Sequence, residues 1–193
     1  MISPEDVCAV IVTRGNVALQ PILATLPYDD VVVWDNSQQQ REWRCYGRYL
    51  AVAETDKPVI YFQDDDLIFT AHDELMALYQ PDCMVVNMPS PWYETCGYDR
   101  LGQALVGAGS LVPRGLPFPA LRSYLALYPL DELFLNYADV VVGMLTPFER
   151  VDLGYEVLPY ASAPGRIYTS PGAAERKQTM QQRVLGMREA VAA

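Results

Sequence analysis

The chain has 193 residues, of which 51% are hydrophobic and 20% charged, and its formal net charge is −10. This length and composition predict one globular domain with a sizeable core, and the acidic balance argues against a protein that coats nucleic acid, which needs a basic face. We expect a soluble, cytoplasmic protein, because no apolar run reaches the roughly 18–20 residues of a membrane span and the first residues lack the pattern of a signal peptide.

The first seventy residues alternate between apolar runs and helical patterns. The first run, VCAVIVT, is continuous and β-branched, which is typical of a strand buried on both faces. Asn16 is a plausible N-cap for the helix that follows. Strands alternating with helices predict an α/β domain with a parallel sheet and right-handed crossovers. The expected elements, in the order strand, helix, strand, helix, strand, are 7–13, 16–26, 30–35, 40–55 and 58–63.

The second half of the chain is less regular. Thr70 and Asp73 have capping-box spacing at the start of a helix, which places the single histidine, His72, at a helix end. A long segment rich in Pro, Gly and aromatic residues predicts a loop of the kind that often carries function. The expected elements are a helix at 72–79, a strand at 82–88, that loop at 89–102, a strand at 103–114, a helix at 130–143, a returning strand at 155–160, and a C-terminal loop and helix over 161–191.

Cysteine and histidine usage restricts the possible metal sites. The cysteines form no CxxC pair, which argues against a zinc site or a disulfide framework. One histidine cannot form a cluster of histidine ligands. We expect the four cysteines to be small core residues in a reducing compartment: Cys8, Cys45, Cys83 and Cys96.

Polar side chains follow each of the first three expected strands. The strand ends read TRGN at 13–16, DNS at 35–37 and DDD at 64–66. In open α/β sheets, ligands bind beyond the carboxyl ends of the strands. The three strand ends together therefore predict a binding site at one edge of the sheet.

The three consecutive carboxylates of Asp64, Asp65 and Asp66 are the most distinctive of these features. Adjacent like charges are costly unless a cation neutralises them. Mg²⁺ and Mn²⁺ prefer oxygen ligands and are often held by one or two carboxylates together with substrate phosphates. The cluster therefore predicts binding of a metal and a diphosphate; the alternative is a solvated acidic turn, since Asp is a common turn residue.

The segments VCAVIVTRGN, VVVWDNS and YFQDDDL, in this order and spacing, resemble the GT-A fold glycosyltransferases, especially small inverting, family-2-like and exostosin-like members. The resemblance implies a single Rossmann-like GT-A domain over 1–193, with a mostly parallel sheet and helices on both faces. It further implies a nucleotide-binding half at 1–70, a donor-sugar and acceptor half at 82–160, and a C-terminal loop and helix at 161–193.

The resemblance also implies roles for particular residues. Asp66, with Asp64, would hold Mn²⁺ or Mg²⁺ through the D-x-D motif. Trp92 would contact the acceptor, or would belong to the core. The glycines of VGAGSLVPR would let the backbone approach the donor closely, although a bulge in a strand is the simpler explanation. The donor would be a UDP- or GDP-linked sugar, bound by Thr13, Arg14, Asp35, Asn36, Asp64, Asp65, Gly107, Gly109 and Arg166.

DELFLN, at 131–136, resembles the E-D-x-x-x-N pattern of the same family. The match makes Glu132 the general base that deprotonates the acceptor hydroxyl, with Asp131 as the second choice. Acidic residues are also common at helix N-termini for purely structural reasons. In the tail, Arg166, Arg176 and Lys177 would stabilise the departing nucleotide, or would lie on a solvated basic helix.

The leading hypothesis is a metal-dependent hexosyl- or pentosyltransferase that moves a sugar from a nucleotide donor to an acceptor hydroxyl with inversion. The acceptor class stays open among glycans, lipids, proteins and modified nucleobases. A nucleotidyltransferase of the same fold is an alternative, although TRGNVAL contains only one Gly and one Arg. DDDLI also contains the D-x-D-x-I of haloacid-dehalogenase-like phosphatases, but there the motif follows the first strand. A non-catalytic nucleotide- or sugar-binding module is the fourth possibility.

Overall fold

A computed structural model shows the arrangement of the chain and describes residues 2–162 and 166–192. The strands are β1 (Val7–Thr13), β2 (Asp30–Asp35), β3 (Val59–Asp64), β4 (Leu67–Ile68), β5 (Met84–Asn87), β6 (Ala108–Pro113), β7 (Phe148–Val151) and β8 (Glu156–Val157). The helices are α1 (Gln20–Leu23), α2 (Gly47–Ala51), α3 (His72–Ala77), α4 (Ser90–Thr95), α5 (Tyr98–Leu101), α6 (Pro117–Leu125), α7 (Glu132–Leu145) and α8 (Ala173–Ala192).

Six strands form one central sheet in the order β2-β1-β3-β6-β5-β7. The pairs β1–β2, β1–β3 and β5–β7 are parallel, and β6 runs antiparallel to both of its neighbours. The fold is therefore α/β with a mostly parallel central sheet, as the sequence predicts, and it is consistent with a single Rossmann-like domain. β1 and β3 are almost completely buried, in agreement with their continuous apolar sequences.

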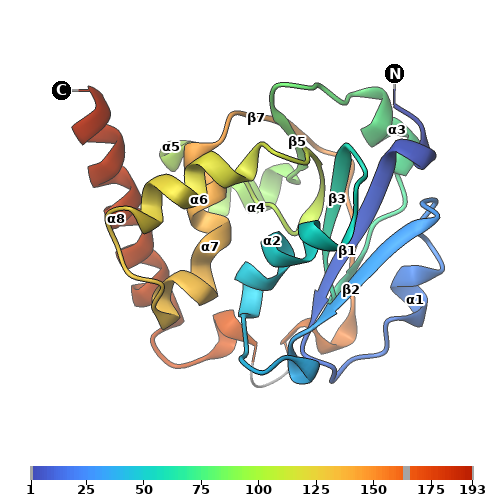
Figure 1. The fold of residues 1–193 in the computed structure, drawn as a ribbon, viewed down its shortest axis with the longest axis horizontal. Helices are drawn as coiled ribbons and strands as arrows, with labels where there is room; N and C mark the ends of the chain where they lie inside the picture. Colours follow the sequence, from blue (N-terminus) through green and yellow to red (C-terminus); the bar gives the residue numbers. More distant parts are fainter. Residues whose placement is uncertain (1, 163–165, 193) are drawn as a thin grey trace.

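Helices cover both faces of the sheet (Figure 1). On one face, α2, α6, α7 and α8 enclose a core that includes Val10, Phe62, Tyr124 and Phe134. On the other face, α3 packs over a smaller cluster that contains Ala9, Tyr61 and Leu75. Among the described residues, no helix is long and apolar enough to cross a membrane.

Several predicted elements are wrong in their extent. The helix expected at 16–26 is the single turn α1, whose N-cap is Leu19 rather than Asn16. The helix expected at 40–55 begins only with a 3₁₀ turn at Arg44–Tyr46, followed by α2. The loop expected at 89–102 contains α4 and α5, and the strand expected at 103–114 is β6 alone.

Other differences concern the role of an element rather than its length. The segment expected to return to the sheet at 155–160 contains β8, which pairs with β4 in a separate two-stranded sheet. Helix α6 and the edge strand β7 were not predicted. No side chain caps α3, so the predicted capping box is absent there, and His72 is buried against Tyr28, Tyr61 and Phe69. Cys96 is exposed and is therefore not a core residue.

Candidate functional site

A cavity of about 440 Å³ lies at the carboxyl ends of β1 and β3, between the sheet, α7 and the C-terminal segment. Of the residues that the sequence singled out for the site, nine line the cavity: Thr13, Arg14, Asn36, Asp64, Asp65, Asp66, Gly107, Arg166 and Lys177. The strand-end rule locates such a cavity, because parallel strands deliver their last residues to one edge.

A buried arginine connects two of the acidic residues in this cavity. Arg48, from α2, forms ion pairs with Asp64 and, at 3.3 Å, with Asp139 from α7. Its side chain is 3% exposed, whereas those of Asp64 and Asp139 are 42% and 26% exposed. Although burial lowers the pKa of Arg48, the charges of Asp139 and Asp64 outweigh that effect and raise it. Arg48 is therefore a fixed cation in the wall of the cavity.

A second arginine neutralises the middle carboxylate of the cluster. Arg166 donates to Asp65 at 2.5 Å and lies 3.9 Å from Asp66. Burial, and then the neighbouring charge of Asp64, raises the pKa of Asp66 to about 7, against the opposing charge of Arg166. Of the three consecutive acids, Asp66 is thus the one whose charge is least compensated.

The charge balance of the cluster leaves room for a divalent cation. Four carboxylates (Asp64, Asp65, Asp66 and Asp139) face two guanidinium groups, which leaves an excess of two negative charges when all are ionised. Within residues 2–162 and 166–192, no three acidic, Cys or His side chains converge as a complete metal site. A cation would therefore need oxygen atoms from a ligand besides Asp66, which is how Mg²⁺ is commonly held.

Gly107 allows the acidic cluster to adopt this geometry. The Asp64 N–H donates to the Gly107 carbonyl at 2.7 Å, and a Cβ atom on Gly107 would overlap the Asp64 carboxylate. Gly109 has a different role, since its φ of +93° favours glycine and its missing Cβ faces Phe69 in the core. Gly109 does not line the cavity.

The ends of β1 and β2 form the other wall of the cavity. Arg14 pairs with Glu42 at 3.2 Å. Asn36 is buried, and its side-chain oxygen accepts from the backbone N–H of Arg44 at 3.0 Å, which holds Arg44 in the left-handed region with a φ of 55°. Asp35 caps the N–H of Ser37 at 2.8 Å and does not line the cavity.

The acids at the start of α7 also lie outside the cavity lining. Asp131 caps the helix by accepting from the Phe134 N–H at 2.8 Å and lies 3.4 Å from Arg183. Glu132 is exposed. Its role as general base stays a prediction that the geometry does not support directly. Trp92 belongs to α4, but its side chain lies outside the described residues.

The sequence analysis missed Arg48 and Asp139, and it used Asn136 only as the last residue of the DELFLN pattern. Asn136 donates to the Glu132 carbonyl and accepts from Arg44 at 2.6 Å, so it joins the start of α7 to the Arg44 turn. Arg48 and Asp139 are isolated charges within apolar stretches, CYGRYLA and LNYADVVV. Since a charge on a buried helix face needs a partner, this pattern was an available signal for an internal ion pair.

Comparison with known proteins adds no assignment: no protein-family model and no curated sequence matches the chain. Any statement about function therefore depends on the geometry and charge of the cavity.

Proposed function

We propose that the protein is a metal-dependent glycosyltransferase that moves a sugar from a UDP- or GDP-linked donor to an acceptor hydroxyl with inversion. The observation that carries the proposal is the acidic cluster Asp64–Asp66, with its excess of negative charge, at a strand end inside a cavity. The resemblance of the first seventy residues to GT-A enzymes supports the same interpretation. Both features favour a ligand that brings a diphosphate and a divalent cation together.

The residues present fit a divalent cation. Asp66 is the first candidate ligand because no arginine neutralises it at short range, and Asp64 is the second. When bound, Mn²⁺ or Mg²⁺ would neutralise charge on the departing diphosphate. Arg166 lies beside the same acids and would add positive charge there.

The other lining residues suit the remaining parts of a nucleotide sugar. Asn36 and Arg14 lie at the β1 and β2 ends, where the nucleoside would bind. The absence of a side chain at Gly107 lets the backbone approach the sugar closely. The acceptor oxygen would form its bond to the anomeric carbon as the bond to the diphosphate breaks, and its proton would pass to a carboxylate. Glu132 stays the candidate for that acid on the strength of the resemblance alone.

The competing function is a nucleotide- or sugar-binding module without turnover. Two observations favour it: Asp64 and Asp65 are already neutralised by arginines, and the expected base lies outside the cavity lining. A module of this kind would bind the donor and release it unchanged.

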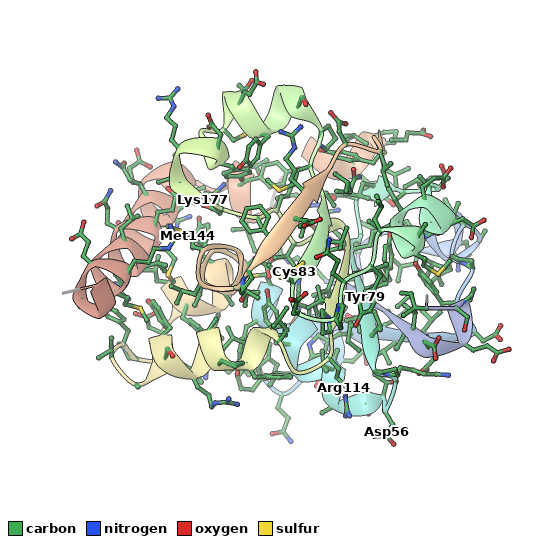
Figure 2. The ribbon with its side chains drawn as sticks, turned by 90° about the horizontal axis from the view of Figure 1, so that it is seen from above. Asp56, Tyr79, Cys83, Arg114, Met144 and Lys177 are labelled. Carbon is green, nitrogen blue, oxygen red and sulfur yellow. The ribbon has the colours of Figure 1, made fainter. Side chains whose placement is uncertain are left out.

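A panel of nucleotide sugars tests both functions, scored by thermal shift and by slow donor hydrolysis with Mn²⁺, Mg²⁺ or chelator. We expect stabilisation by one UDP- or GDP-linked donor that requires metal and is lost in Asp66→Asn. The matched control is Asp56→Asn, which changes an exposed acid that pairs with Arg114 at 3.7 Å, at the rim of the molecule in Figure 2. Equal stabilisation in chelator would refute the metal assignment.

The variant Glu132→Gln separates the enzyme from the binding module. In an enzyme that uses Glu132 as base, hydrolysis and transfer should be lost while the metal-dependent thermal shift is kept. A wild-type protein that binds the donor with no turnover at all would support the module instead.

A further inference from the structure

Lys177 is a cation in the cavity lining to which the proposed donor site assigns no role. It belongs to α8, lines the cavity, and its Nζ contacts the Tyr98 hydroxyl of α5. The ammonium also lies 4.4 Å from the centre of the Tyr98 ring. Figure 2 shows Lys177 where α8 faces the light-green helices α4 and α5. The chain has only one other lysine, Lys57.

This partly buried ammonium pairs with no carboxylate within residues 2–162 and 166–192. Among the described residues, its only hydrogen-bond partner is Tyr98, which is neutral near pH 7 because burial raises its pKa further. Burial lowers the pKa of Lys177, and the group that opposes this effect is Cys96 rather than a carboxylate. A buried cation normally has an anionic partner, and in a chain of net charge −10 acids are plentiful. The remaining N–H groups of Lys177 are therefore available to an external anion.

A second donor lies beside Lys177. Gln103 is buried and lines the cavity, and its Oε1 accepts from Gln181 Nε2 at 2.7 Å. That hydrogen bond orients the Gln103 amide, and no described residue accepts from its Nε2 group. Lys177 and Gln103 both line the cavity and both contact Tyr98, since the Gln103 backbone N–H donates to the Tyr98 carbonyl at 3.0 Å. Their unused N–H donors are a combination suited to a phosphate group.

We propose that Lys177, Gln103 and Tyr98 form a subsite for a phosphate group carried by the acceptor. The proposed function assigns the diphosphate of the nucleotide to Asp66 and Arg166. Lys177 is treated as a separate site because the Asp64–Asp66 carboxylates are not among the charges that shift its pKa. The proposal rests on the glycosyltransferase function only for the identity of the molecule that carries the anion. The anion site itself can be tested without any turnover.

The test uses the two lysines of the unmodified protein. The chain is acetylated with an N-hydroxysuccinimide ester, and the rates at Lys177 and Lys57 are measured by peptide mass spectrometry, with and without inorganic phosphate. Phosphate at about twice its dissociation constant should slow acetylation of Lys177 about threefold, because only the free fraction reacts. Lys57, whose Nζ donates to the Glu5 carbonyl on the surface, should be unaffected and serves as the internal control.

A second arm separates the acceptor subsite from the donor site. With UDP and Mn²⁺ at saturation, phosphate should still protect Lys177. Protection by UDP and Mn²⁺ alone, with no further effect of phosphate, would assign Lys177 to the donor diphosphate and overturn the proposal, as would the absence of protection by phosphate. Direct phosphate titration should show binding retained in Lys177→Arg and lost in Lys177→Met. Failure of every nucleotide sugar to bind would refute the proposed function while leaving the phosphate result intact.

Discussion

The variant Arg48→Met tests how the charges of the cavity are held. Methionine keeps most of the length of the side chain but removes the cation that contacts both Asp64 and Asp139. Breaking a buried ion pair by removing one partner costs about 3–5 kcal/mol, whereas an exposed pair is worth about 0–1 kcal/mol. Arg48 is buried, but both acids reach water, so they are not left in a dry interior. We therefore expect a loss of about 2–3 kcal/mol.

The loss should depend on pH in a defined direction. Burial raises the pKa of Asp139 and Arg48 opposes that rise, so Arg48→Met should raise this pKa further. A carboxyl whose folded pKa lies above its unfolded pKa makes stability fall as the pH rises. The deficit of the variant should therefore be largest at about pH 8 and smaller at about pH 5.

Urea denaturation followed by tryptophan fluorescence measures these differences. Arg122→Met, at an exposed position on α6, is the control and should stay within about 0.5 kcal/mol of the wild type. In the double variant Arg48→Met/Asp139→Asn, we expect a loss smaller than the sum of the single losses by about 1–2 kcal/mol. A wild-type stability for Arg48→Met at pH 8, or a deficit that grows as the pH falls, would refute the reasoning.

Three further predictions concern the cluster and the core. In chelator, Asp66→Asn should raise the free energy of unfolding, measured by urea denaturation, by about 2–4 kcal/mol at about pH 8. Because burial raises the pKa of Asp66 to about 7, this gain should shrink as the pH falls from 7 towards 3.8. His72→Phe should flatten the loss of stability between pH 6.5 and about 4 in the same assay, since burial lowers the pKa of His72 to about 4 and only the unfolded chain takes up the proton there. Gly107→Ala should displace Asp64, cost about 1–3 kcal/mol of stability and abolish the metal-dependent thermal shift, whereas Gly115→Ala, where an added Cβ meets nothing within 4 Å, should change neither.

The parts of the fold that the sequence predicts well are those determined by local pattern. β1 and β3 are continuous apolar runs, and their limits agree with the prediction within a residue or two. β7, with the sequence FERV, carries two charges at the edge of the sheet, so apolar periodicity gives no signal for it. α6 begins with Pro117 and Pro119 and resembles a loop in composition, although proline is well tolerated in the first turn of a helix.

The candidate site likewise has parts that the sequence predicts and parts that it does not. The strand-end rule found the cavity because the topology of a parallel sheet follows from the order of its elements. It could not find the pairing of Arg48 with Asp139, because that contact depends on how α2 and α7 cross the same face of the sheet. The strand-end rule also could not tell which of two neighbouring residues lines the cavity. Asn36 does, whereas the carboxylate of Asp35 accepts from the Ser37 N–H instead.

The choice among three adjacent carboxylates likewise depends on tertiary contacts. Asp64 pairs with the buried Arg48. If Asp64 moved to bind a metal, the Arg48 charge would keep only Asp139 as its partner among the described residues. Asp65 is buried against Arg166. Asp66 lies 3.9 Å from Arg166, farther than Asp64 or Asp65 lies from its own arginine, and burial raises its pKa, so its charged form is disfavoured without a ligand. A bound divalent cation would supply the positive charge that Asp66 lacks and would take the place of its proton. The proposal therefore assigns the metal to Asp66 first.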